Sequence, residues 1–148
     1  SEAKYGTKIM VEVPTHIAGV MDFQNGAVGT IITSFDVWAH EHPGIEVYGT
    51  HGSLSVPNPN SFGGPAKIKR AGAEKWAEVP LTHGYTENSR GLGVADMADA
   101  IKRNTPFRAS GALTYHVLEC MHGFHIASDE GKHYNLTSPG IQPAPLPM

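Results

Sequence analysis

Residues 17–37 read IAGVMDFQNGAVGTIITSFDV and carry the strongest structural signal in the chain. Two largely apolar runs, Ile17 to Phe23 and Val28 to Val37, flank Asn25-Gly26, a dipeptide that tolerates positive φ at both positions. It therefore predicts a β-hairpin with a two-residue loop, which also fixes the register. The predicted opposing pairs are Phe23 with Val28, Met21 with Thr30, Gly19 with Ile32, Val20 with Ile31 and Ala18 with Thr33.

Both faces of this predicted hairpin carry apolar side chains. A sheet with one face in water shows a cleaner alternation of apolar and polar residues. We therefore expect helices to cover one face and another surface, that of a partner subunit, to cover the second. Phe35 lies in the longer run and Trp38 comes directly after it. Both are expected in this interface, because large aromatic rings gain most from burial.

Shorter alternating runs predict further strands. The first is Lys8 to Val13, which Pro14 ends. The segment 57–65 is rich in proline and glycine and is expected to be a surface loop. The other predicted strands are Ile45 to Gly49 and Ser53 to Val56, which form a second hairpin, Ala66 to Arg70 and Lys75 to Val79 around Gly72, and Lys132 to Leu136.

The second half of the chain has the periodicity of helices. From Ser89 onward an apolar stripe of Val94, Met97, Ala98 and Ile101 predicts one helix, which Asn104 and Pro106 end. Ser110 is a suitable N-cap for a second helix, which stops near Gly131. Its stripe is Leu113, Val117, Met121 and Phe124. Strands followed by helices indicate an α+β domain.

The composition excludes several classes of protein. The chain has 148 residues, the length of one domain, with 40% hydrophobic and 17% charged residues. A net charge of -3 gives no basic surface for nucleic acid. No apolar run is long enough to span a membrane. We therefore expect a soluble protein. The single cysteine, Cys120, excludes an intrachain disulfide and fits the reducing cytoplasm, which is the expected location.

Four stretches, taken in order, carry a resemblance to a known family. They are residues 19–31 (GVMDFQNGAVGTI), 48–54 (YGTHGSL) and 93–101 (GVADMADAI), and Arg108-Ala109-Ser110-Gly111 with His116-Val117-Leu118-Glu119. Their order and spacing resemble the carboxyl-terminal domain of the Gfo/Idh/MocA family, the glucose-fructose oxidoreductase and inositol dehydrogenase group. The resemblance runs from about Lys8 to the end of the chain.

The resemblance implies an open-faced, largely antiparallel β-sheet with helices packed on one face, a dihydrodipicolinate-reductase-like carboxyl-terminal domain. It implies that residues 1–148 form a single substrate and oligomerisation domain, paired through the exposed sheet face into a homo-oligomer. The parent enzyme would oxidise a secondary alcohol of a sugar or polyol with NAD or NADP. Its hydride chemistry would belong to an amino-terminal Rossmann domain.

The family's catalytic motifs are absent from this chain. Gly91-Leu92-Gly93 follows a polar loop and so lacks the strand before it that a dinucleotide turn needs. Glu74-Lys75 precedes Trp76 rather than the proline of the family's Glu-Lys-Pro motif, and Gly63-Gly64 has no Asp and His at the family's spacing. We therefore expect no cofactor in this chain and no hydride transfer by it alone.

Substrate contacts are expected on the loop 82–90, which is rich in polar and aromatic side chains. His83, Tyr85 and Arg90 are the candidates, because such side chains hold sugar hydroxyls and a loop of this region approaches the substrate in the relatives. The alternative is an ordinary solvated loop. Asp36 is a further candidate for the pocket, and His40 fits either the pocket or the interface.

Three other hypotheses remain open. The histidine pairs His40 with His42 and His122 with His125 have metal-ligand spacing, but no third ligand completes either. Ser34, Asp36 and His116 are the side-chain types of a catalytic triad, which only geometry identifies. A non-catalytic association module, using the sheet face alone, is the main alternative to the oxidoreductase domain. Asp96 and Asp99 are expected on a solvated helix face, with Asp99 paired to Lys102 and Arg103.

Overall fold

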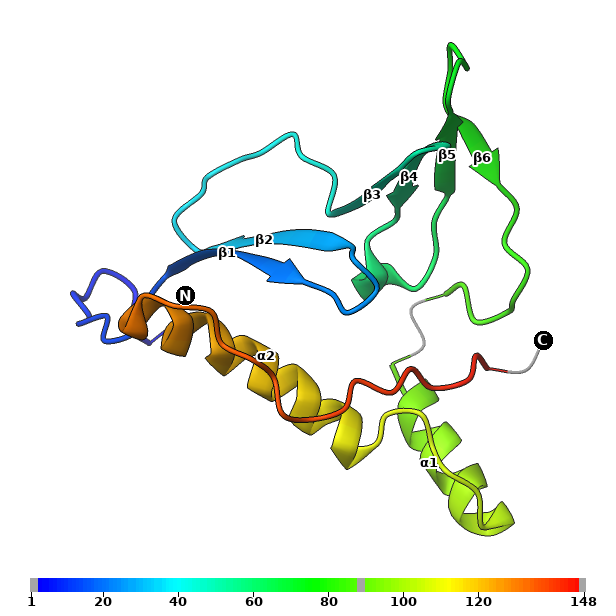
Figure 1. Cartoon of the computed structure of the whole chain (residues 1–148). Coiled ribbons are helices and arrows are strands. Elements are labelled where there is room, and N and C mark those ends of the chain that lie inside the picture. The colour runs from blue at the N-terminus through cyan, green and yellow to red at the C-terminus, as the bar shows by residue number, and fades with distance from the viewer. Residues whose placement is uncertain (1–2, 88–89, 147–148) are drawn as a thin grey trace. The chain divides into compact units, whose positions relative to one another are not determined.

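The computed structural model describes residues 3–87 and 90–146, and it contains α-helices and antiparallel strands (Figure 1). The predicted α+β class is therefore confirmed. Contacts divide the chain into two compact units. One comprises Ser1–His40 and Gly123–Tyr134, and the other comprises Glu41–His122 and Asn135–Met148.

The first unit contains the hairpin of β1 (His16–Asp22) and β2 (Val28–Ser34). Its loop differs from the prediction. Phe23 N donates to Ala27 O at 2.9 Å and Gly26 N to Phe23 O at 2.8 Å, which leaves a loop of three residues with Gly26 at φ 87°. Asn25 Oδ1 also accepts from Ala27 N at 3.0 Å, so the Asx side chain favours this longer turn.

The extra loop residue shifts the register by one, and the predicted pairs are wrong. Asp22 lies opposite Val28, and Val20 lies opposite Thr30. In a three-residue hairpin loop the third residue is in the left-handed conformation, and Gly26 supplies it. Asn-Gly occurs in both two-residue and three-residue hairpin loops, so the dipeptide alone does not determine the loop length.

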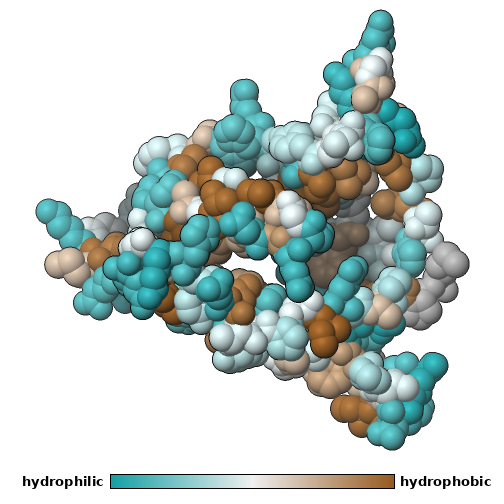
Figure 2. Space-filling model, in the orientation of Figure 1, coloured by the Kyte–Doolittle hydropathy of each residue, from teal (hydrophilic) through white to brown (hydrophobic). Residues whose placement is uncertain are grey.

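One face of the hairpin packs on helix α2 (Gly111–Glu130), as predicted. Gly19 of β1 lies against Phe124, because a Cβ on Gly19 would stand 2.5 Å from the ring atoms Cδ1 and Cε1. The opposite face is exposed and apolar, and apolar groups lie at the surface over the hairpin in Figure 2. Its members are Ala18, Val20, Val28, Thr30 and Ile32, with His16 and Ser34 at one end and Asp22 at the other.

The second unit contains a four-stranded antiparallel sheet in the order β3-β4-β5-β6. Its strands are β3 (Ile45–Gly49), β4 (Gly52–Val56), β5 (Ala66–Arg70) and β6 (Ala77–Val79), so the predicted second hairpin and the pair around Gly72 are confirmed. Val47, Leu54 and Ile68 pair across one face, and Tyr48, Ser53 and Lys69 across the other. Unlike the first hairpin, this sheet alternates cleanly between an apolar and a polar face.

The two helices end where the capping residues predict. Helix α1 (Leu92–Arg103) stops at Asn104, which is left-handed at φ 54°, and Ser89, its predicted start, lies outside the described residues. Helix α2 begins after Ser110, whose Oγ accepts from Leu113 N at 3.2 Å. Gly131, at φ 64°, follows its last residue.

Two predicted strands are wrong. Residues 8–13 and 132–136 adopt no regular structure, although both alternate in sequence. A strand exists only when a neighbouring strand completes its hydrogen bonds, and no strand of the described chain pairs with either segment. Residues 8–13 are also exposed throughout.

Candidate functional site

A cavity of about 280 Å³ lies in the second unit, beside the loop that follows β6. The loop begins at Pro80, where the missing backbone N–H ends the strand pairing. Thr82 Oγ1 lies 2.9 Å from His83 Nδ1, which joins the two polar side chains at the rim. The lining residues are Phe62, Ala66, Val79, Pro80, Leu81, Thr82, His83, Gly84 and Thr86.

The loop is held against the preceding surface loop. A Cβ on Gly63 would stand 2.4 Å from Thr86 O, so only a glycine allows this close approach of the two backbones. Arg90 Nη2 donates to Asn60 Oδ1 at 2.8 Å and reaches Asn60 O at 3.4 Å. Asn60 belongs to a 3-10 turn (Pro59–Ser61) that Asn58 caps. The cavity is therefore built by two loops that brace each other.

The three predicted contacts have different positions. His83 lines the cavity. Arg90 is hydrogen-bonded to Asn60 and acts as a brace. Tyr85 is outside the lining set, is half exposed and has a φ of 63°, a left-handed conformation that strains a residue with a bulky side chain.

Sequence reasoning missed Phe62, Leu81 and Thr86. Phe62 lies in the segment assigned to a surface loop, and an aromatic residue among prolines and glycines was the available signal. The lining combines apolar side chains with a hydroxyl and an imidazole, and so provides contact area with a few polar groups, as small-molecule sites do. The lining residues include no Asp, Glu or Cys, so the arrangement is suited to binding and provides no pair of carboxylates for acid-base chemistry.

Asp36 lies in the first unit, at the open end of the hairpin. Its carboxylate accepts a hydrogen bond from Thr15 Oγ1, and its backbone N–H donates to Ser34 Oγ at 3.1 Å. The bond to Thr15 joins the start of β1 to the end of β2, and the bond to Ser34 fixes the turn after β2. Asp36 and the residues of the 280 Å³ cavity belong to different units.

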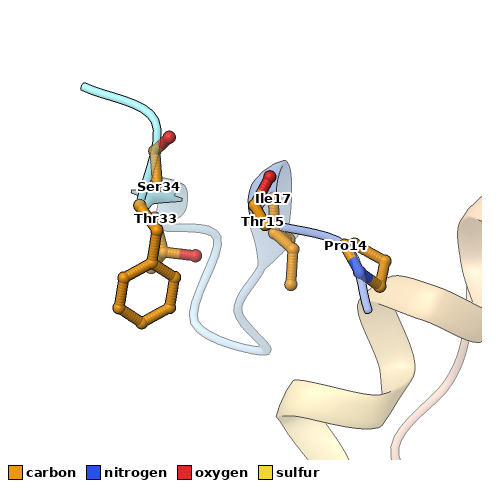
Figure 3. A pocket seen from close by; sticks show the side chains of 6 residues that line it. Pro14, Thr15, Ile17, Thr33 and Ser34 are labelled. Carbon is orange, nitrogen blue, oxygen red and sulfur yellow. The ribbon is translucent and has the colours of Figure 1, made fainter. Parts of the chain in front are cut away.

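A smaller hollow of about 180 Å³ lies at this end of the hairpin (Figure 3). It is lined mainly by apolar groups of Pro14, Thr15, Ile17, Thr33, Ser34 and Phe35. Phe35 is 94% exposed and Trp38 is 103% exposed, although both are large aromatic residues. Two such rings in water close to the end of β2 would gain stability from burial against another surface.

The side chain of Glu119 organises a second polar cluster, and it is only 8% exposed. Its two oxygens accept from Thr137 N at 2.8 Å, Thr137 Oγ1 at 2.7 Å, Ser138 N at 2.9 Å and the hydroxyl of Ser138. The hydroxyl of Ser138 and the other three donors favour the ionised form, and they lower the pKa of Glu119 to about 2. This cluster fastens the segment after α2 to the helix.

His116 and Cys120 extend the same cluster. His116 Nδ1 lies 2.8 Å from Ser138 Oγ, and its Nε2 lies 3.8 Å from Cys120 Sγ. Burial, followed by the negative charge of Glu119, raises the pKa of the Cys120 thiol, which keeps it in the unreactive form. Because His116 is bonded to Ser138, and Ser34 and Asp36 lie in the other unit, the described contacts do not assemble the hypothetical triad.

Arg108 fastens the tail at a second point. Its Nε and Nη2 donate to Ala144 O and Pro145 O, each at 2.9 Å. Asp96 accepts from the guanidinium Nη1 and from Arg108 N. Asp99 makes the predicted pair with Arg103, at 3.0 Å, whereas Asp96 has this second role that helix periodicity did not indicate.

Neither a metal site nor a dinucleotide site is formed by the described residues. Within 3–87 and 90–146, no group of three or more His, Cys, Asp or Glu side chains is placed to hold a metal ion. Gly91 and Gly93 flank the start of α1, but β6 ends at Val79 and a loop intervenes, so the strand-turn-helix geometry that receives a pyrophosphate is not formed. These residues do not fit NAD or NADP.

The comparisons with known proteins identify one match. Residues 2–55 match the family model described as GFO/IDH/MocA C-terminal domain. No curated protein and no solved structure matches the chain. Neither helix in the described part of the chain is long and apolar enough to cross a membrane.

Proposed function

Because this chain carries, over residues 2–55, a C-terminal domain of the Gfo/Idh/MocA family, we propose that it is the substrate-side and oligomerisation domain of an NAD(P)-dependent oxidoreductase. The parent enzyme acts on a secondary alcohol of a sugar or polyol. An amino-terminal Rossmann domain binds the nicotinamide cofactor, which supplies the hydride chemistry, and this chain supplies one wall of the pocket and the contact between subunits.

The uncovered face of β1 and β2 is the observation that carries the proposal. Val20, Val28 and Ile32 are 61%, 67% and 67% exposed on a face whose reverse packs on α2. Soluble monomers rarely leave a contiguous apolar face in water. The face lies within the segment that matches the family.

The 280 Å³ cavity supports the substrate assignment. Its lining presents a Thr82 hydroxyl and the His83 imidazole, which both donate and accept hydrogen bonds, together with the apolar side chains of Phe62 and Leu81. A sugar or polyol offers hydroxyls to the polar groups and C–H groups to the apolar ones. The cavity is open and small, so in the complete enzyme it forms part of a larger site.

Val28→Asp tests the assembly surface. A carboxylate on the apolar face is costly to bury, so the oligomer formed by the wild type should dissociate. Val94→Asp is the matched control, because Val94 is 70% exposed on α1, which belongs to the other unit. Sedimentation velocity should give monomers for Val28→Asp only. An unchanged oligomer in Val28→Asp would refute the sheet face as the subunit contact.

His83→Ala and Thr82→Val in the full-length enzyme test the substrate wall. Loss of one hydrogen bond at the rim should raise KM about tenfold for the sugar or polyol and leave the KM for NAD or NADP unchanged. Glu78→Gln, an exposed residue on β6 outside the cavity lining, is the control. If neither rim variant changes KM or kcat, this loop does not contact the substrate.

A non-catalytic association module is the alternative, favoured by the same exposed sheet face. Isothermal titration of sugars and polyols into the chain separates the two, because a module that only binds protein gives no heat with any of them. In that case Val28→Asp would still abolish assembly, and the kinetic effects of the rim variants would be absent.

A further inference from the structure

Residues 8–13, Lys-Ile-Met-Val-Glu-Val, form an unpaired segment with the sequence of a strand. Every residue of it is exposed, including Ile9 at 68% and Met10 at 85%. No hydrogen bond joins its backbone to the rest of the described chain. It leads through Pro14 and Thr15 directly into β1, so its last residue lies close to the start of the hairpin.

We propose that residues 8–13 of two copies of this chain pair as antiparallel strands about a two-fold axis at Met10. In this register Lys8 of each copy lies opposite Glu12 of the other, and Ile9 lies opposite Val11. Directly opposed charges of unlike sign stabilise an antiparallel pair, and β-branched neighbours pack well. The segment is therefore complementary to itself in charge and in shape.

Other registers lose this complementarity. A shift by one residue places Ile9 opposite Glu12 and Lys8 opposite Val13, so both charges face apolar side chains. A parallel, in-register pair brings Lys8 near Lys8 and Glu12 near Glu12, which is repulsive. The antiparallel pair also separates its faces, because Ile9, Val11 and Val13 alternate with Lys8, Met10 and Glu12.

The pairing depends on the proposed sheet-face assembly. A two-stranded ribbon is at best marginally stable in water, so it needs an apolar surface to cover its Ile9 and Val11 side. An assembly through β1 and β2 brings two copies of the segment to one interface. The ribbon then completes backbone hydrogen bonds that the single chain leaves to water, and it fixes the two-fold symmetry of the contact.

Charge reversal tests the register by sedimentation equilibrium. Lys8→Glu and Glu12→Lys each convert two attractive contacts into two repulsive ones and should weaken self-association about tenfold. The double variant Lys8→Glu/Glu12→Lys should restore it. An equimolar mixture of the single variants should form heterodimers, because the carboxylate introduced in one chain then opposes the ammonium group introduced in the other.

Several outcomes separate this inference from the proposed function. If Val28→Asp dissociates the oligomer but neither charge reversal changes it, the sheet face stands and the ribbon is wrong. Failure of the double variant to restore association would also overturn the ribbon. If the wild type remains monomeric at every concentration, both the ribbon and the assembly role fail.

Cysteine cross-linking gives a second, independent measurement. In a Cys120→Ser background, Met10→Cys should form a disulfide-linked dimer under mild oxidation, because among antiparallel registers only the proposed one places residue 10 opposite itself. Lys8→Cys should not, since its equivalents lie four residues apart on each strand. Val94→Cys controls for random collision. Cross-linking of Lys8→Cys but not Met10→Cys would refute the register.

Discussion

Glu119 stabilises the end of the chain through four hydrogen bonds to two consecutive residues, Thr137 and Ser138. All four donors point at a carboxylate, so they favour the charged form and the folded state together. Neither the spacing between Glu119 and Ser138 nor helix periodicity indicates this contact, because the two segments meet only after the chain reverses at Gly131.

The pH dependence of stability should reveal this carboxylate. Its pKa falls from 4.5 to about 2 on folding, so its contribution is complete above pH 4.5 and is lost as the pH falls through 2. Glu119→Gln should be less stable than the wild type at pH 7, with the difference approaching zero near pH 2. Thermal melts followed by circular dichroism at both pH values measure this. Equal differences at both would contradict the assignment.

Gly19 is required by the packing of β1 on α2. Gly19→Ala places a Cβ 2.5 Å from the ring of Phe124, and we expect a loss of about 1–3 kcal/mol from overpacking. Gly44→Ala is the control, because its Cβ meets open space. Urea unfolding measures both. Phe124→Leu combined with Gly19→Ala should recover part of the loss, and no recovery would show that the ring is not the obstacle.

Helices and strands were predicted correctly where the residues that determine them lie close together in the sequence. Asn104, Ser110 and Gly131 correctly marked helix ends, since capping depends on residues a few positions away. Strands need distant partners, which is why 8–13 and 132–136 were predicted as strands and are not. The hairpin loop was predicted in place and was wrong in length by one residue.

The candidate site was predicted less completely than the elements. His83 was found because its loop is polar and aromatic, whereas Phe62 and Leu81 reach the same cavity from a loop and a strand end that hydrophobic periodicity does not describe. Arg90 has the donors of a substrate ligand, and the structure uses its Nη2 to hold Asn60. Residue type therefore indicated the loop, and only the folded backbone shows which of its residues line the cavity.

Two aspartates on α1 provide a matched comparison at the level of the helix. Asp96 is 12% exposed at its side chain and bonds Arg108, which also holds the tail, whereas Asp99 pairs with Arg103 in water. Asp96→Asn should cost about 1–3 kcal/mol and Asp99→Asn less than about 0.5 kcal/mol. Urea unfolding of both variants tests this. Equal losses would mean that the tail contact contributes nothing.

At the scale of the whole molecule, the uncovered apolar face of the hairpin is the feature that bears on stability. Val20 and Val28 of this face are mostly exposed. Such a chain gains stability when other protein surface covers these side chains.

Stability should therefore depend on protein concentration. For a dimer that dissociates on unfolding, a hundredfold increase in concentration should raise the Tm by about 4 °C. Scanning calorimetry of the wild type measures the shift, and Val28→Asp should remove it. A wild-type Tm that is constant over this range would show that self-association does not stabilise the fold.

The Asn25-Gly26 turn also determines how the molecule ages. Deamidation at Asn-Gly begins when the backbone nitrogen of the glycine attacks the asparagine side chain. In the folded hairpin Gly26 N donates to Phe23 O and Asn25 Oδ1 accepts from Ala27 N, so both reacting groups are engaged. Conversion to isoaspartate should proceed only while the turn is open. The rate at which isoaspartate accumulates in stored protein therefore reports how often the hairpin opens, and mass spectrometry measures that rate.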